Sequence, residues 1–375
     1  MKFARRLLEL GADVNPRDNH GKTPLHVTRS RNEDIGLLSL EHGADPGLQD
    51  DDGQTPLHVA SQQRRLNFTQ QLLESGADVN SCDNQGRTPL HVIQRGWDNL
   101  GLLLLEHGAD PGIRDDASQT PLHLASRSGN LKIVQQLLEL GPDINPRDNQ
   151  GRTPLHVIEF LSEDVALLLL ERGADPGVRD DAGQTLLHVA ARWGRLTFSR
   201  RLLELGVGVN SRDNQGRTPL HVIEYCSKDI RLPPPLLERG ANQDVRDNDG
   251  HTPLHAIAQW GILKVTQRLL DLGLNVNWGD YRGQTHFDRA GKWCKDFSLL
   301  LLEHGADPGI LDNDGQTPLH VASRVGNLSV AQQLLKFDVD VNSHDGQGQT
   351  PFQISVEVGD DEMQELLLDH GAEWP

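Results

Sequence analysis

The chain has 375 residues and a formal net charge of −18 at pH 7, from 36 lysines and arginines against 54 aspartates and glutamates. A single hydrophobic core stops growing near about 250–300 residues, so this length excludes one simple globular core. The acidic charge argues against a polyanionic partner such as nucleic acid or an anionic membrane.

Cysteine use and hydropathy exclude several further classes of protein. Cys82, Cys226 and Cys294 are far apart and form no Cys-x-x-Cys pair, which excludes a disulfide framework or a zinc module and is typical of a reducing compartment. No run of about 18 apolar residues predicts a transmembrane helix, and the N-terminus lacks the apolar segment of a signal peptide. We expect a monomeric protein of the cytoplasm or nucleus, without membrane insertion.

In chain order, residues Lys2 to Asn15 predict one helix and its exit loop. A tetrapeptide, Thr-Pro-Leu-His, then appears and returns every 32 to 34 residues. A period in this range indicates a solenoid, in which each unit packs only on its neighbours. The intact copies begin at Thr23, Thr55, Thr88, Thr120, Thr153, Thr218, Thr252 and Thr317, and the altered copies at Thr185, Thr285 and Thr350.

Each unit predicts the same local structure. Residues 83–87 (DNQGR) are typical of a tight turn, with the glycine at a positive φ. Thr88 is expected to cap a first helix that begins at the following proline and covers 90–94. A second helix is predicted over 99–106 and is closed by Gly108 as a left-handed cap. Such short helices are marginal in isolation, so the unit must be repeated.

These features together resemble the ankyrin repeat. The resemblance depends on Asp-x-x-Gly-x-Thr-Pro-Leu-His, on Leu-Leu-Glu-x-Gly-Ala-Asp and on the period, and it covers essentially the whole chain. It implies an all-α ankyrin-repeat solenoid of helix-turn-helix units with short β-hairpin fingers, about eleven full repeats after a partial first. The full repeats are expected to start at Asp18, Asp50, Asp83, Asp115, Asp148, Asp180, Asp213, Asp247, Asp280, Asp312 and Asp345.

A longer period is superimposed on the repeats. The sequence DNQGRTPLHVI begins at Asp83, Asp148 and Asp213, a step of 65 residues that indicates a duplicated two-repeat cassette. The 65-residue period is interrupted at Pro233–Pro235, where the repeat is two residues longer. Because prolines inside a helix cost about 3 kcal/mol or more, we expect the second helix to start only after Pro235 and a hinge to form here.

The predicted organisation follows from that break. A partial N-terminal repeat occupies 1–17, a first block of repeats occupies 18–246, and a second block occupies 247–375. The last helix of the second block begins with three acidic residues, which suit a helix N-terminus and give the array a polar C-terminal cap.

No pattern predicts catalysis or a bound metal or cofactor. The motif histidines, His26 to His320, occur once per repeat, too far apart to share a metal at bonds of about 2 Å, so each is expected to bond its own turn and threonine. Gly21-Lys22-Thr23 lacks the upstream glycine of a phosphate loop. The acidic fingers at 50–53 and 247–250 lack the closing glutamate of a calcium loop. We therefore expect no enzyme activity, no cofactor and no metal site.

Aromatic residues gather where the motif is altered, and they are the candidate binding residues. Tryptophan and tyrosine are common hot spots at protein interfaces, although the rings could instead cover irregular packing around the prolines. The candidate protein-binding residues are Trp193, Tyr225, Trp260, Tyr281 and Trp293, together with the finger-tip Arg217.

The predicted function is non-catalytic protein binding through the concave face and the finger tips, as the resemblance implies, with a protein partner that the sequence does not identify. Two alternatives stay open. The chain could be the targeting segment of a larger signalling or enzymatic protein, because Phe3, Leu7 and Leu8 would be left uncovered at its first helix. It could also be a purely structural spacer.

Overall fold

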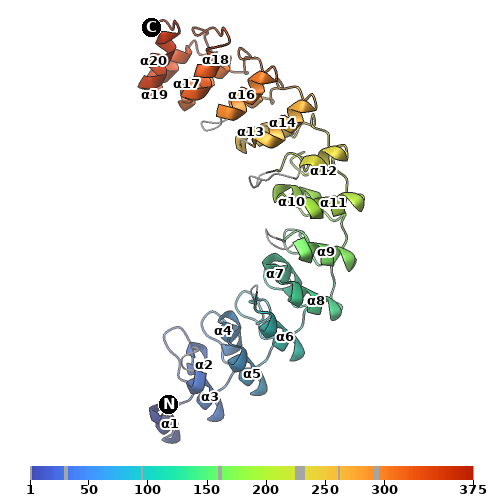
Figure 1. Ribbon diagram of the computed structural model, residues 1–375. Coiled ribbons are helices and arrows are strands. Elements are labelled where there is room, and N and C mark those ends of the chain that lie inside the picture. The colour runs from blue at the N-terminus through green and yellow to red at the C-terminus, as the bar shows by residue number, and fades with distance from the viewer. Residues whose placement is uncertain are drawn as a thin grey trace. The chain divides into compact units, whose positions relative to one another are not determined.

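The computed structural model describes residues 2–28, 33–93, 96–158, 163–223, 233–260, 262–289 and 295–374. These residues form two compact units, Met1–Asp181 and Ala182–Pro375, and each unit is a row of helix pairs (Figure 1). Among the described residues, no helix is both long enough and apolar enough to cross a membrane. The expected division of the repeats between 246 and 247 stays a prediction.

The first unit contains α1 (Lys2–Glu9), α2 (Pro24–Val27), α3 (Glu33–Glu41), α4 (Pro56–Gln62), α5 (Leu66–Glu74), α6 (Asp98–Glu106), α7 (Pro121–Ser128), α8 (Leu131–Glu139) and α9 (Glu163–Glu171). The second unit contains α10 (Leu186–Arg192), α11 (Leu196–Glu204), α12 (Pro233–Glu238), α13 (Pro253–Trp260), α14 (Leu263–Asp271), α15 (His286–Arg289), α16 (Lys295–Glu303), α17 (Pro318–Val325), α18 (Leu328–Leu334), α19 (Pro351–Val358) and α20 (Asp361–Asp369).

The core of each unit lies between the helix pairs. In the pair α4 and α5, Leu57, Phe68 and Leu72 are completely buried. The second helices of successive repeats pack side by side, α3 on α5, α5 on α6, α6 on α8 and α8 on α9 (Figure 1). Stacking therefore buries the apolar faces that one short pair would leave in water.

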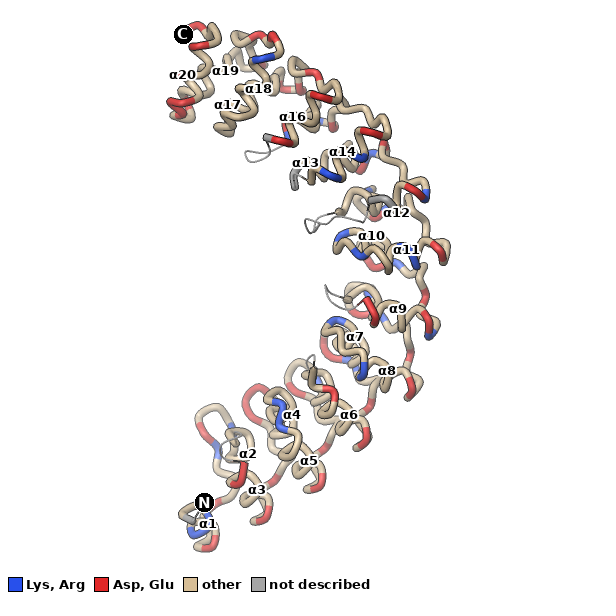
Figure 2. The backbone as a smooth tube through the Cα atoms, viewed as in Figure 1, with Lys and Arg blue, Asp and Glu red and all other residues tan. Residues whose placement is uncertain are grey.

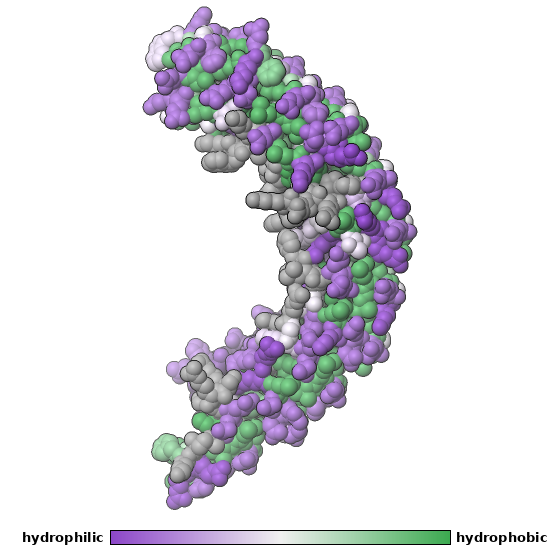
Figure 3. Space-filling model, viewed as in Figure 1, coloured by the Kyte–Doolittle hydropathy of each residue, from purple (hydrophilic) through white to green (hydrophobic). Residues whose placement is uncertain are grey.

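Polar residues cover much of the surface that remains exposed to water after the repeats stack. Apolar patches in both units are interrupted by polar side chains (Figure 3). Acidic residues recur in the turns that follow second helices, such as Asp78 after α5 and Asp110 after α6 (Figure 2). The negative charge is thus spread along the repeats.

The first element of a repeat comes in two lengths. The first helix has seven or eight residues where the second residue after the motif histidine is alanine, as in α4, α7, α10 and α17. Where Val92-Ile93 or Val157-Ile158 follows the histidine, the described residues form only turns. Two successive β-branched side chains lose rotamer freedom against the preceding turn and disfavour a helix. The predicted helix at 90–94 is therefore wrong over 90–93, and residues 94–95 lie outside the described ones.

The fingers are hydrogen-bonded turns. In the finger at 83–87 the first N–H donates to the last carbonyl (N to O 2.9 Å), and the carboxylate of Asp83 accepts two further backbone N–H groups. Gly86 has a φ of +71°, as predicted. No strand longer than an isolated bridge, such as Gly279 with Thr285, occurs in the described residues. The expected β-hairpin is reduced to a turn because the aspartate satisfies donors that a strand ladder would use.

In most of the described repeats the motif histidine joins one repeat to the next. Nδ1 of His58 accepts from the backbone N–H of Thr55 (3.2 Å) and lies 2.9 Å from its hydroxyl, which confirms the predicted bond to the threonine. With Nδ1 accepting, Nε2 carries the proton and donates to the carbonyl of Arg87 in the next finger (2.8 Å). Burial lowers the pKa of His58 and keeps it neutral. The same bridge is made by His26, His91, His123, His188, His221, His255 and His320.

The altered motif at Thr285–Asp288 keeps the bonds to its own threonine but lacks the bridge to the next finger. Oδ2 of Asp288 accepts from the backbone N–H of Thr285 (2.7 Å) and from its hydroxyl (3.0 Å). Oδ1 is buried and has no hydrogen-bond partner among the described residues. Burial raises the pKa of Asp288 to about 6, and the carboxylates of Asp312 and Asp280 add to the rise. A carboxylate cannot donate, so the bridge that histidine makes elsewhere is missing here.

The predicted start of the proline-rich helix is wrong. Helix α12 begins at Pro233 and includes all three prolines. In the first turn of a helix a missing N–H costs nothing, because those groups have no partner within the helix. The helix has six residues, against nine in α9 and α11. Residues 224–232 lie outside the described ones, and the hinge expected there stays a prediction.

Candidate protein-interaction surface

A hollow of about 830 Å³ lies in the first unit between fingers and first elements, and we call it the finger hollow. It spans three successive repeats, those of α4, of the turn at 89–92 and of α7. Both polar and apolar side chains form its walls. They include Gln62, Arg87, Ile93, Gln119, Leu124 and Arg127.

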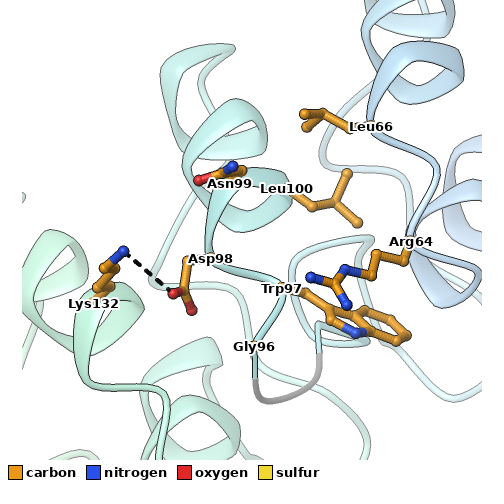
Figure 4. Close-up of a pocket in the computed structure, with 8 residues that line it drawn as sticks. All are labelled: Arg64, Leu66, Gly96, Trp97, Asp98, Asn99, Leu100 and Lys132. Atoms are coloured by element: carbon orange, nitrogen blue, oxygen red, sulfur yellow. Dashed lines mark ion pairs between the residues drawn. The ribbon is translucent and has the colours of Figure 1, made fainter.

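A second hollow, of about 400 Å³, opens where the first elements of the same repeats lead into the second helices, and we call it the loop hollow. Trp97, the N-cap residue of α6, presents a half-buried indole to it. In the close-up view, Arg64 and Trp97 lie at one end, and Asp98 and Lys132 lie at the other (Figure 4). The hollow thus combines one large apolar ring with two cationic side chains.

The two hollows belong to the same stretch of surface. The finger hollow reaches Gln62 and Ser128, the last residues of α4 and α7. The loop hollow begins at Arg64 and Lys132, a few residues further along the chain. We refer to both together as the repeat groove.

Among the described residues, four cations line the repeat groove, and two of them are neutralised within the chain. Arg87 bonds Asp83 of its own finger (2.7 Å), and Lys132 lies 3.6 Å from Asp98. Burial opposes ionisation of Asp83, but the hydrogen bonds from the Arg87 side chain and backbone outweigh it and lower its pKa. The histidine of the groove adds no charge near neutral pH, because burial lowers its pKa.

Arg64 occupies an unusual backbone conformation. Its φ is +59°, in the left-handed region that favours glycine. The same position, nine residues after the motif threonine, is glycine in sister repeats, with φ of +70° at Gly129, +66° at Gly194 and +65° at Gly326. An arginine at this place is strained by about 1–2 kcal/mol relative to the glycine that the fold prefers.

Of the sequence-predicted site residues, the structure describes Trp193, Arg217 and Tyr281, which belong to three different repeats of the second unit. Trp193 caps the C-terminal end of α10 and is half-buried, and Tyr281 is a finger residue that is 61% exposed. The guanidinium of Arg217 bonds Asp213 of its own finger (2.9 Å). Tyr225, Trp293 and the side chain of Trp260 lie outside the described residues. Their role in binding stays a prediction.

Sequence reasoning missed the groove residues Arg64, Trp97 and Arg127. A signal for Arg64 was available, because it stands where other repeats have glycine. Trp97 follows its motif histidine by six residues, one more than Trp193, so an alignment on the fifth position passes over it. Arg127 has no distinctive neighbours in sequence.

Within the described ranges, one group of side chains has potential ligand atoms close enough for a metal ion, namely Asp247, Asp249 and His251. Its chemistry is already that of an ion-pair network. Nδ1 of His251 lies 3.2 Å from Asp247, and Nε2 lies 3.3 Å from Asp280. The guanidinium of Arg289 contacts both His251 and Asp280, so it supplies the positive charge that a metal would bring.

Comparison with known families identifies the class of protein. The chain matches the family described as "Ankyrin repeats (3 copies)" over residues 28–115, 92–180, 158–230, 226–312 and 292–374. It therefore belongs to the ankyrin repeat family, as its motif suggested. Ankyrin repeats are protein–protein interaction modules and are generally non-catalytic.

Two curated relatives are similar over a short part of the repeats. A "Probable E3 ubiquitin-protein ligase XBOS34" from Oryza sativa subsp. japonica is 38% identical over 76 residues, 20% of this chain and 15% of the relative. A "Putative E3 ubiquitin-protein ligase XBAT35" from Arabidopsis thaliana is 38% identical over 78 residues, 20% of this chain and 17% of the relative. The chain thus spans less than a fifth of the length of either relative.

Proposed function

We propose that this chain is a non-catalytic binding module that holds a segment of another protein in the repeat groove of its first unit. The observation that carries this proposal is the pair of adjoining hollows, of about 830 and 400 Å³, on three successive repeats. Peptide-sized sites are concave and combine apolar walls with a few polar groups. The repeat groove offers Ile93, Leu124 and Trp97 beside arginine and glutamine side chains.

Blocking the groove tests the proposal. Ser128 lines the finger hollow and is half-buried at the end of α7, so Ser128→Trp fills the hollow with little effect on the core. The matched control is Gln70→Trp on the exposed side of α5. Proteins retained by the wild-type chain on a column should be lost with Ser128→Trp and kept with Gln70→Trp. Equal retention by both variants would contradict the proposal.

The aromatic residues of the second unit define a second candidate surface. Trp193 is half-buried at the end of α10, and Tyr281 is exposed on its finger, so both have surface to offer a partner. The triple change of Trp193, Trp260 and Trp293 to alanine should abolish capture with a nearly unchanged melting curve if they bind. A large loss of stability would show instead that the rings serve packing.

A second candidate function is target recognition within a larger protein. The relatives that carry similar repeats are named as ubiquitin ligases, and this chain matches only a small part of each. We propose on that basis that the repeats could select substrates for an attached activity. The protein isolated from its source cells would then be larger than 41.5 kDa and carry a further domain. A product of 41.5 kDa would favour an independent cytoplasmic binder.

A further inference from the structure

The charges of the repeat groove are unbalanced. Among its four cations, Arg87 and Lys132 are paired with carboxylates. Arg64 and Arg127 form no ion pair with any carboxylate in the described part of the chain. The carboxylate on the finger side, Asp115, accepts two backbone N–H groups at Oδ1, at 3.0 and 2.7 Å, and no ion pair joins it to either arginine. In a chain of net charge −18, the described residues of the groove therefore include two guanidinium groups that are paired with no carboxylate.

The second unit shows that this imbalance is local. Eight residues after the finger glutamine, both α10 and α17 carry an arginine, in the same position as Arg127. Arg324 donates to the amide oxygen of Gln316 (2.8 Å), and Arg192 donates to that of Gln184 (3.2 Å). No such bond joins Arg127 to Gln119 in the described part of the chain, although the side-chain NH2 of Gln119 approaches Asp148 at 3.5 Å just as that of Gln316 approaches Asp345 at 3.5 Å. The Arg127 guanidinium is thus available for a ligand.

Arg64 supports the same conclusion from the backbone. The fold accepts glycine at this position in the sister repeats, and the arginine keeps their left-handed conformation. The conformation places an exposed guanidinium at the Trp97 end of the loop hollow (Figure 4). Strained backbone conformations are concentrated at functional sites, so the left-handed arginine at the rim of the hollow supports a role in binding.

We propose that the repeat groove recognises an extended acidic segment of a partner protein, a deepening that rests on the proposed function. Carboxylates of the segment bind Arg64 and Arg127, since planar guanidinium groups match carboxylates in paired hydrogen bonds. An apolar side chain between the carboxylates lies on Trp97 and Leu66. The overall negative charge of the chain does not prevent this, because charges beyond about 8 Å are screened at physiological salt.

Binding of defined peptides by the full chain tests the assignment. The probe is fluorescein-labelled Gly-Glu-Glu-Leu-Glu-Glu-Gly, and its neutral counterpart has glutamine in place of each glutamate. Fluorescence anisotropy should show at least about tenfold tighter binding of the acidic peptide, and its affinity should fall as salt rises. Arg127→Ala and Arg64→Gly should each weaken it about tenfold. The matched control Arg324→Ala, on the second unit, should leave it unchanged.

Three outcomes would overturn the inference. These are equal binding of the acidic and neutral peptides, an effect of Arg324→Ala as large as that of Arg127→Ala, and tighter arginine-dependent binding of a single-stranded oligonucleotide. The proposed function is tested separately. If Ser128→Trp abolishes capture of a partner protein while acidic peptides fail to bind, the groove is a binding site for another chemistry and only this inference fails.

Discussion

The same position in two repeats of this protein serves two purposes. At the end of α17 in the second unit, Arg324 bonds Gln316 of its own finger, and the following Gly326 closes the helix at a φ of +65°. In the first unit, no bond joins Arg127 to its finger glutamine in the described part of the chain, and an arginine, Arg64, takes the glycine position after α4. The backbone is the same in both. The difference teaches that a repeat's scaffold can be held constant while its side chains are either used internally or left for a partner.

The largest expected effect tests whether the scaffold is common to both units. His123→Ala and His320→Ala each remove a buried imidazole that bonds its threonine and the next finger. Each should lower the free energy of unfolding by about 2–4 kcal/mol, because a cavity and unpaired polar groups remain. Urea unfolding followed by circular dichroism measures the loss. The exposed His20→Ala is the control, and a loss confined to one unit would break the comparison.

The pH dependence of the free energy of unfolding tests the altered motif at Asp288, which has a carboxyl group where most other repeats have a neutral histidine. The pKa of Asp288 is about 6 in the folded chain and 3.8 for an unperturbed aspartate, so folding takes up a proton between these pH values. Its contribution to the free energy of unfolding is present below pH 4 and is lost as the pH rises through 6. Asp288→Asn should therefore stabilise the chain by up to about 3 kcal/mol at pH 7.5 and by little at pH 4.

Urea unfolding of both proteins at the two pH values measures that difference. The buried histidines nearby, with a pKa of about 2 for His255 and about 4 for His286, are present in both proteins, so their own titration contributes equally to both. Asp249→Asn, on the exposed part of a finger, is the control. A gain from Asp288→Asn that does not change with pH would show that the buried carboxyl group is not the cause.

A smaller effect on the free energy of unfolding should distinguish Arg324 from Arg127. Arg324→Ala removes a hydrogen bond within the chain and should lower the free energy of unfolding by about 0.5–1.5 kcal/mol. Arg127→Ala removes no recorded bond and should be neutral to within about 0.5 kcal/mol. Thermal unfolding by calorimetry measures both. Equal losses would mean that Arg127 is used by the fold, and the distinction between the units would fail.

Much of the fold follows from the sequence. The period, the left-handed glycines and the second helices are local or periodic features, and the helix predicted over 99–106 is observed as Asp98–Glu106. The length of the first helix was missed at Val92-Ile93, where β-branched residues overcame the helical pattern. The histidine bridge to the next finger was also missed, because it depends on how repeats stack and no single repeat encodes it.

The candidate site was harder to predict for a physical reason. An interaction surface is defined by which side chains remain unpaired after folding, and pairing is a property of three-dimensional contacts. Arg127 and Arg324 have near-identical sequence surroundings, yet only one bonds its finger glutamine. Tryptophans are conspicuous in sequence, which drew the prediction to Trp193 and its neighbours in the second unit.

The most direct test of the account is to replace Arg64 by glycine and to measure stability and acidic-peptide affinity on the same protein. The account predicts that the free energy of unfolding rises by about 1 kcal/mol, because strain at the left-handed position is relieved, while the peptide Kd rises about tenfold. The reverse change in the second unit, Gly326→Arg, should destabilise by a similar amount without altering binding. If Arg64→Gly lowers stability, or leaves the Kd unchanged, Arg64 is not held for a ligand and the account is contradicted.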